Sequence, residues 1–276
     1  MIIWLASYPK SGNTWVRLFI DCLLYSENKK TNINKVSIRA FPIRRDFNGL
    51  CNIAEQNEFL ENCGVAQDKV NLDNKIKIFK THHALWKYKN FIFTNEENTF
   101  GTIYIVRDPR NIITSIKNHY SKESYDEAFE FMKDEKNIIG ERYSNLQTNL
   151  PTIISSWSNH YNSWKKLKKN YLLIKYENLL NQPDSEFLKI TKYLEENFNK
   201  QFTNKEIKSA IDSCQFKKLQ NQESESGFVE AANKNGKFSK FFYLGPNNKW
   251  EKMLSLKTKH KVENCFKTEM KELNYL

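Results

Sequence analysis

Short apolar runs interrupt an otherwise polar chain, and four of them have the pattern of buried strands. Each is five residues long, rich in β-branched or aromatic residues, and without the alternation of a half-exposed strand. Strands covered on both faces of a parallel sheet have this pattern. The four runs are Ile2–Ala6, Ile76–Lys80, Thr102–Val106 and Tyr171–Lys175.

Between these runs, apolar residues recur at helical spacing. The expected helices are Thr14–Tyr25, Pro109–His119, Pro151–Asn170, Pro183–Phe198 and Thr258–Leu273. Strands that alternate with helices predict an α/β fold, in which a central mostly parallel sheet is flanked by helices as a three-layer sandwich. Right-handed crossovers then bring the loops that follow the strands to one sheet edge, where such folds bind ligands.

Nothing in the 276 residues marks a linker, an internal repeat or a low-complexity tract, so we expect a single domain over residues 1–276. Two segments, 28–74 and 221–249, lack a regular pattern. Long irregular segments of compact domains often form lids or binding walls. We expect these two to serve as an acceptor wall and a lid.

The composition limits the kinds of ligand and site that we expect. A net charge of +11 favours an anionic ligand, but the lysines are dispersed rather than gathered in a stripe with aromatics, so we expect a doubly phosphorylated nucleotide and no nucleic acid. Five scattered cysteines without a C-x-x-C pair argue against disulfides and zinc, and no metal is expected. The apolar runs are too short for a transmembrane segment or a signal peptide, which predicts a soluble, cytoplasmic protein.

The first candidate site lies where the opening strand runs into a helix. The chain there reads YPKSGNTW, which predicts a turn and a helix that begins at Asn13 or Thr14. Unpaired N–H groups and the positive end of the helix dipole at such a point bind phosphate or sulfate. Lys10 adds a positive charge. This order differs from the nucleoside-triphosphate loop G-x-x-x-x-G-K-[ST], because Lys10 precedes Gly12, the only glycine of this segment.

The second and third strands also end in groups suited to anion chemistry. Lys80 and His82 follow the second strand, and a histidine titrates near neutrality. Arg107 ends the third strand, with Ser115 about two helical turns later, and a guanidinium can bind phosphate in a bidentate way. A packed histidine and a capping network around Asp108 are the structural alternatives.

Together these segments resemble the sulfotransferases that use 3′-phosphoadenosine 5′-phosphosulfate (PAPS). YPKSGNTW resembles their 5′-phosphosulfate loop, Lys80-Thr-His82 their Lys-Thr-His segment, and Val106–Ser115 their 3′-phosphate segment V-R-[ND]-P-x-D-x-x-x-S. The similarity recurs in order over residues 2–17, 78–83, 103–120, 151–180 and 214–252. It implies a P-loop-containing α/β fold and a PAPS-dependent sulfotransferase (EC 2.8.2 class) that releases 3′-phosphoadenosine 5′-phosphate (PAP) without a metal.

The resemblance also implies roles for single residues. His82 is the expected catalytic base, and Lys10 and Lys80 are expected to neutralise the leaving group, whereas His83 and His160 are expected to be structural. Trp15, Tyr176 and Phe216 match the positions that enclose adenine in the family. The expected donor-binding residues are Pro9, Lys10, Ser11, Gly12, Asn13, Thr14, Trp15, Arg107, Ser115, Tyr176, Phe216, Phe241 and Gly245.

The segment from Phe241 to Trp250 resembles the family loop F-x-R-K-G-x-x-G-D-W, which closes over the 3′-phosphate. Phe241, Gly245 and Trp250 keep the spacing, but Tyr243 and Leu244 replace the Arg-Lys pair. Nearby lysines are candidates to replace the two lost charges, namely Lys237, Lys240 and Lys249.

The acceptor is expected to present a hydroxyl or an amine on a small molecule or carbohydrate. Arg39, Arg44 and Arg45 stand near aromatic residues and suit a sugar or an anionic acceptor. One alternative is a kinase or NTPase of the P-loop class, which needs Mg²⁺ and an acidic ligand such as Asp108. Another is a non-catalytic nucleotide-binding relative that lost activity with the Arg-Lys pair.

Overall fold

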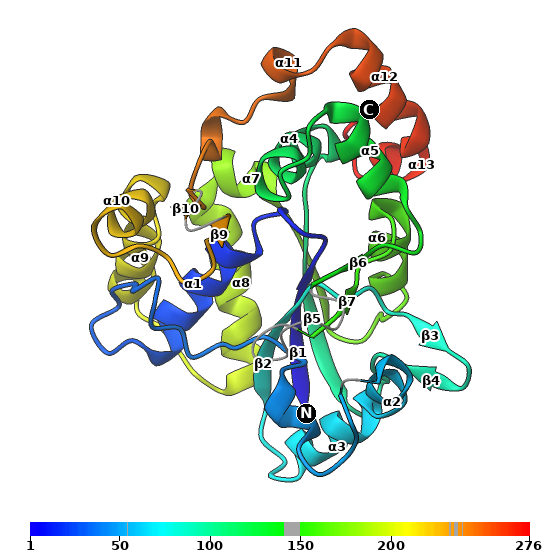
Figure 1. Ribbon diagram of the computed structural model, residues 1–276. Helices are drawn as coiled ribbons and strands as arrows, with labels where there is room; N and C mark the ends of the chain where they lie inside the picture. Colours follow the sequence, from blue (N-terminus) through cyan, green and yellow to red (C-terminus); the bar gives the residue numbers. More distant parts are fainter. Residues whose placement is uncertain (54, 141–149, 232, 235–236, 239) are drawn as a thin grey trace. The chain divides into compact units, whose positions relative to one another are not determined.

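The computed structural model describes residues 1–53, 55–140, 150–231, 233–234, 237–238 and 240–276 (Figure 1). Its main sheet has the strand order β2-β1-β5-β8, and β1 pairs in parallel with β2 and with β5. Every residue of β1 is buried, which accounts for its unbroken apolar run. All four predicted strands are present, as β1 (Ile2–Ser7), β2 (Lys77–Thr81), β5 (Thr99–Val106) and β8 (Tyr171–Lys175).

Short antiparallel pairs and helices make up the rest of the described structure. The pairs are β3 (Lys87–Tyr88) with β4 (Phe91–Ile92), β6 (Ile138–Ile139) with β7 (Thr152–Ile153), and β9 (Asn233–Lys234) with β10 (Lys237–Phe238). The helices are α1 (Asn13–Tyr25), η1 (Arg44–Phe47), α2 (Gln56–Glu61), α3 (Cys63–Asn71), α4 (Pro109–His119), α5 (Tyr125–Lys133), α6 (Trp157–Trp164), α7 (Tyr176–Asn181), α8 (Pro183–Phe198), α9 (Asn204–Ser213), α10 (Phe216–Ser226), η2 (Gly245–Asn247), α11 (Trp250–Met253), α12 (Leu256–Cys265) and α13 (Lys267–Glu272). The predicted α/β class, with a mostly parallel central sheet flanked by helices, is confirmed.

Helices α4 and α8 have the predicted bounds because local chemistry fixes their ends. The Asp108 carboxylate accepts a hydrogen bond from the Arg110 N–H at 2.8 Å and so caps α4, with Pro109 in its first turn. α8 likewise has Pro183 in its first turn, and it ends at Phe198, just before Asn199, whose φ of 49° lies in the left-handed region.

Two predicted helices are wrong in extent. The helix expected over Pro151–Asn170 exists only as α6, because Ser156 caps a helix that begins at Trp157 and the preceding residues pair as β7. The helix expected over Thr258–Leu273 is two helices, α12 and α13, which meet at the buried Phe266.

The segment 28–74 is not irregular throughout, since it contains η1, α2 and α3. Phe47 of η1 and Phe59 of α2 pack with ring centroids 5.1 Å apart, so burial of aromatics organises this stretch without a long periodic pattern. The segment 221–249 is partly helical as well, because α10 extends to Ser226.

By its internal contacts the chain divides into two compact units, each built from three separate stretches. Unit 1 comprises Met1–Ser11, Arg39–Val106 and Glu130–Leu173, and unit 2 comprises Gly12–Ile38, Arg107–Phe129 and Ile174–Leu276. The single-domain organisation stays a prediction. Among the described residues, no helix combines the length and the apolar character that crossing a membrane requires.

Candidate active site

The loop after β1 is shaped by two residues in the left-handed region of backbone conformation, Lys10 with φ 67° and Gly12 with φ 101°. The Ser11 N–H donates to the Tyr8 carbonyl at 3.3 Å. α1 begins at Asn13 with Gly12 as its N-cap, and no side chain caps the first turn from that position. The geometry is that of an anion loop, in which backbone N–H groups and the helix dipole meet.

Ser11 of this loop carries a buried hydroxyl that could donate to an anion. Its side chain is buried, and its hydroxyl has no hydrogen-bond partner among the described residues. A buried hydroxyl left unpaired costs about 1–3 kcal/mol, and a phosphoryl or sulfuryl oxygen is an acceptor that would remove this cost. Of the other predicted loop residues, Pro9, Asn13 and Thr14 are buried and Lys10 is half-buried.

In unit 1, His82 follows β2 and bonds to the end of β1. Its Nδ1 lies 2.8 Å from the Ser7 carbonyl oxygen and 3.3 Å from the Ser7 hydroxyl. A carbonyl can only accept, so Nδ1 carries the proton and Nε2 keeps its lone pair. Burial, and next the charge of Lys80, lower the pKa of His82 well below its usual 6.5, and Lys10 acts in the same direction. The imidazole is therefore neutral and has an available base nitrogen at neutral pH.

His160 holds the backbone of His82. Its Nε2 donates to the His82 carbonyl at 3.1 Å, while its Nδ1 accepts from the Tyr104 hydroxyl at 2.8 Å. Burial lowers the pKa of His160 to about 3. It is thus a neutral residue with both nitrogens engaged, and its contact with the chain at His82 is a positioning one. The sequence pattern gave no sign of this link to Tyr104.

His83 is also neutral and packed. Its Nδ1 accepts from the Trp86 indole N–H at 3.1 Å and from the Ile153 N–H at 3.2 Å, and its ring stacks on Phe93. Burial lowers its pKa to about 3. These contacts agree with a structural role.

Lys80 is fixed through its backbone by the segment before η1. Its N–H donates to the Arg39 carbonyl and its carbonyl accepts from the Phe41 N–H, both at 3.0 Å. The Arg39 guanidinium pairs with both oxygens of Asp46 and lies over the Phe79 ring. Of the three arginines suggested for an acceptor, Arg39 is thus committed to the fold, whereas Arg44 and Arg45 are exposed.

In unit 2, several of the residues predicted to bind the nucleotide contact the Tyr176 ring. The Arg107 guanidinium lies 4.1 Å from the centre of the Tyr176 ring, and Trp15 meets that ring edge-on with centroids 5.9 Å apart. A Cβ on Gly12 would come within 2.5 Å of the same ring. The Trp15 indole N–H donates to the Cys214 carbonyl at 2.8 Å, two residues before Phe216.

Phe216 is the first residue of α10, whereas Phe241 and Gly245 lie in the stretch that precedes α11. A Cβ on Gly245 would lie 2.4 Å from the Phe216 ring, so these two residues are in close contact. The Glu223 carboxylate accepts from the Phe241 N–H at 2.6 Å and from the Phe242 N–H at 2.9 Å. A carboxylate of α10 therefore fixes the loop near the position of the missing Arg-Lys pair.

The comparisons with known proteins fit this arrangement. The model of the sulfotransferase domain family matches residues 2–274. The chain belongs to this family. It is 24% identical to sulfotransferase 1B1 of Canis lupus familiaris, over 96% of this chain and 82% of that protein. It is 21% identical to amine sulfotransferase of Oryctolagus cuniculus, over 98% of this chain and 81% of that protein.

The crystal structure of mouse sulfotransferase SULT7A1 complexed with PAP has the same fold. Its TM-score is 0.59 at 19% sequence identity, and the match covers 98% of this chain and 84% of that one. The predictions of a P-loop-containing sulfotransferase fold and of a PAPS-dependent sulfotransferase are confirmed.

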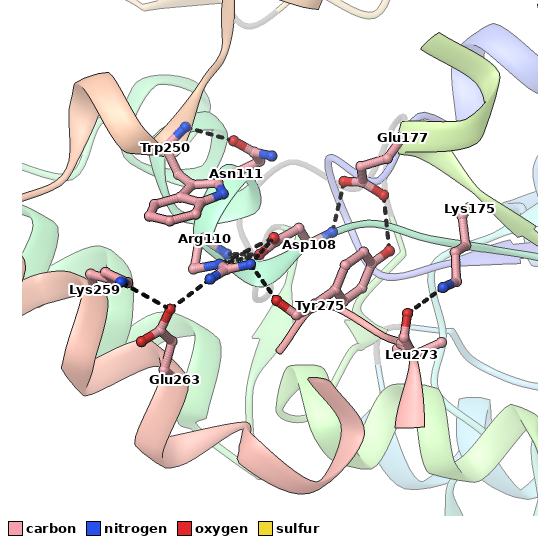
Figure 2. Close-up of polar contacts among 10 residues, drawn as sticks. All are labelled: Asp108, Arg110, Asn111, Lys175, Glu177, Trp250, Lys259, Glu263, Leu273 and Tyr275. Atoms are coloured by element: carbon pink, nitrogen blue, oxygen red, sulfur yellow. Dashed lines mark hydrogen bonds and ion pairs between the residues drawn. The ribbon is translucent and has the colours of Figure 1, made fainter. Parts of the chain in front are cut away.

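For this sulfotransferase, the contacts of Asp108 bear on the alternative of a kinase. Both Asp108 oxygens accept from the Arg110 guanidinium, which also pairs with Glu263 at 2.6 Å (Figure 2). This carboxylate is engaged as a cap and an ion pair, and it is not placed to serve as a Mg²⁺ ligand. Among the described residues, no cluster of three or more His, Cys, Asp or Glu side chains could hold a metal ion.

Figure 2 also shows residues that the sequence did not single out. Glu177 accepts from the Asp108 N–H and from the Tyr275 hydroxyl, each at 2.9 Å. Arg110 donates to the Tyr275 carbonyl at 2.7 Å, and Lys175 donates to the Leu273 carbonyl. Burial raises the pKa of Glu177. These hydrogen bonds connect the end of the chain to residues next to Arg107 and Tyr176, namely Arg110, Lys175 and Glu177.

The two residues that replace the Arg-Lys pair, Tyr243 and Leu244, differ in their exposure to solvent. Tyr243 is 56% exposed and Leu244 is half-buried. Of the three lysines proposed as substitutes, Lys240 and Lys249 are exposed, and the side chain of Lys237 lies outside the described part of the structure.

Proposed function

We propose that this sulfotransferase moves the sulfuryl group of PAPS to a hydroxyl or amine of a small-molecule or carbohydrate acceptor, with His82 as the base. The observation that carries the proposal is the bond from His82 Nδ1 to the Ser7 carbonyl, because it leaves Nε2 as a lone-pair nitrogen. The lowered pKa of His82 keeps that nitrogen unprotonated at neutral pH.

The reaction forms a bond from the acceptor oxygen or nitrogen to sulfur and breaks the bond from sulfur to the 5′-phosphate oxygen of PAPS. His82 takes the acceptor proton. Negative charge grows on the departing phosphate, and Lys10 and Lys80 neutralise it. The backbone donors and the Ser11 hydroxyl of the loop hold the sulfuryl oxygens, which supplies the missing partner of that buried hydroxyl.

The nucleotide part of PAPS is assigned to residues of unit 2. Arg107 and Ser115 bind the 3′-phosphate, and Trp15, Tyr176 and Phe216 contact adenine. The stacking of Arg107 on Tyr176 supports this assignment, because it holds the guanidinium in a fixed plane.

Thermal unfolding with PAP, ADP and Mg-ATP tests the donor. A ligand at about one hundred times its Kd stabilises by ~2.7 kcal/mol, which raises Tm by roughly 5–10 °C in a chain of this size. We expect that shift with PAP and little with the other two nucleotides. A shift with Mg-ATP alone would overturn the proposal in favour of phosphoryl transfer.

The same measurement on His82→Asn and Lys10→Ala separates catalysis from binding. His82→Asn is expected to keep the PAP shift and lose transfer to phenol and sugar acceptors, whereas Lys10→Ala lowers turnover about 10²–10³-fold. The exposed His260→Asn is the matched control. Normal turnover in His82→Asn would remove His82 as the base.

A further inference from the structure

The loop between η2 and α11 carries a buried asparagine that bonds to the candidate 3′-phosphate residue Ser115. Asn248 is 6% exposed. Its Nδ2 donates to the Asn111 carbonyl at 2.8 Å and to the Ser115 hydroxyl oxygen at 3.0 Å. Since a carbonyl can only accept, the nitrogen end of the carboxamide must face α4, and both of its N–H bonds are used there.

These two bonds determine where the Ser115 proton can go. A serine inside a helix commonly donates to the carbonyl four residues earlier, which here belongs to Asn111. That carbonyl already accepts from Asn248, in addition to the helical N–H of Ser115. The Ser115 oxygen in turn accepts from Asn248. Its proton is therefore left for an acceptor outside these groups.

The attachment of this loop to α4 is firm. The Trp250 N–H donates to the Asn111 side-chain oxygen at 2.9 Å (Figure 2). The Arg110 guanidinium lies 4.1 Å from the centre of a Trp250 ring. Asn111 thus holds the loop at two points, its carbonyl at Asn248 and its side chain at Trp250, which leaves Asn248 little freedom to turn its amide away from Ser115.

The charges of this chain depart from the family motifs in a compensating way. Tyr243 and Leu244 remove two cations from the loop, but Asn111 stands where the 3′-phosphate motif has an aspartate, and Lys249 stands where the G-D-W motif has another. The two lost cations are thus matched by two lost carboxylates, and Lys249 adds one cation besides. Asn248 itself replaces the second glycine of the loop motif, so its carboxamide is an added hydrogen-bonding group.

A second observation marks the site as incomplete. The Asn248 side-chain oxygen is buried and has no hydrogen-bond partner among the described residues. A buried acceptor that lacks a donor lowers the stability of the folded protein by about 1–3 kcal/mol. A ligand hydroxyl next to a bound phosphate is a donor of the required kind.

We propose that Asn248 is a positioning residue for the 3′-phosphate of PAPS, which orients the Ser115 hydroxyl toward that phosphate in place of the absent Arg-Lys pair. This rests on the proposed function. PAP and AMP differ only in the 3′-phosphate, so the ratio of their affinities isolates the interaction.

The test is a titration of PAP and AMP by calorimetry into the full chain and four variants. Asn248→Ala is expected to weaken the binding of PAP about tenfold and to leave the affinity for AMP unchanged. Ser115→Ala is expected to have a similar effect, and the double variant should be no weaker than Ser115→Ala alone, because one residue acts through the other. Asn247→Ala, an exposed neighbour, is the control.

The positioning role would be overturned if Asn248→Ala weakened the binding of PAP and of AMP equally. It would also be overturned if the losses of PAP affinity from Asn248→Ala and Ser115→Ala added up in the double variant. If Asn248→Ala does not fold, the isosteric Asn248→Asp replaces it, with a larger loss of PAP than of AMP expected. A wild-type chain that binds AMP as well as PAP would instead contradict the proposed function itself.

Discussion

Position 12 can hold only glycine for two separate reasons. Its φ of 101° lies in a region that side chains rarely adopt, and a Cβ there would overlap the Tyr176 ring at 2.5 Å. The first reason follows from the turn and was foreseeable from the sequence. The second joins the anion loop to a predicted adenine contact far along the chain, and only the structure reveals it.

Gly12→Ala is expected to destabilise the fold by about 1–3 kcal/mol and to weaken PAP binding by displacing Tyr176. Urea unfolding and the PAP shift measure the two effects. Gly64→Ala in α3 is the control, because a Cβ there meets no atom within 4 Å and alanine favours a helix by roughly 0.5–1 kcal/mol. Equal stability of the two variants would contradict this account.

Single residues were predictable where a motif stands at a strand end. Lys10, Lys80 and His82 were found that way, and the structure places all three in unit 1, where both lysines act on the pKa of His82. The tautomer of His82 was not predictable, because it depends on a carbonyl of another strand. The contacts of His160 with His82 and Tyr104, and the role of Glu177, were missed for the same reason: contacts between distant residues leave no local pattern.

At the scale of elements, prediction worked where the chain carries its own start and stop signals. Asp108 with Pro109 and Pro183 fixed the beginnings of α4 and α8. Prediction failed over Pro151–Asn170, where aromatic spacing was extended beyond its true range. Ser156 starts that helix, while Thr152–Ile153 pairs with another strand. Strand pairing with a remote segment therefore overrode the apparent periodicity.

The Tyr275 hydroxyl makes one of the hydrogen bonds that hold the end of the chain. Tyr275→Phe removes the donor to the buried Glu177 and is expected to cost about 1–3 kcal/mol at pH 7.5. The loss should shrink at pH 5, because burial raises the pKa of Glu177 and a protonated carboxyl needs the donor less. Urea unfolding at the two pH values measures this. Leu276→Ala, at a side chain 49% exposed, should be neutral, and an equally large loss there would point to the terminus as a whole.

For the whole molecule, three neutral histidines, of which His83 and His160 are buried, make stability sensitive to acid. The folded pKa values of His82, His83 and His160 all lie below the ordinary 6.5. Each therefore takes up a proton on unfolding once the pH falls below 6.5. Their stabilising effect is complete above pH 6.5 and is lost progressively toward about pH 3, where His83 and His160 titrate in the folded state.

The free energy of unfolding is accordingly expected to fall between pH 6.5 and 4.5 by at most ~4 kcal/mol per pH unit for three groups. Buried carboxyls with raised pKa, Asp108 and Glu177, act in the opposite direction as the pH falls through their raised values toward the ordinary 3.8 and 4.5. Urea unfolding at half-unit intervals checks the slope. His160→Gln should reduce it and the exposed His260→Gln should not, whereas a flat profile would show that these histidines are accessible to protons in the folded state.

The interleaving of the two units has a consequence for the order of synthesis. β1 leaves the ribosome before its partners, which lie far behind it, since Ile2 pairs with Lys77 and with Thr99. Unit 1 ends at Leu173, and unit 2 requires residues up to Leu276. Neither unit can close while the chain is still short, so the nascent protein carries an unpaired apolar strand until β2 and β5 have been made. Such a chain gains little from folding piece by piece and depends on remaining unaggregated until its later segments arrive.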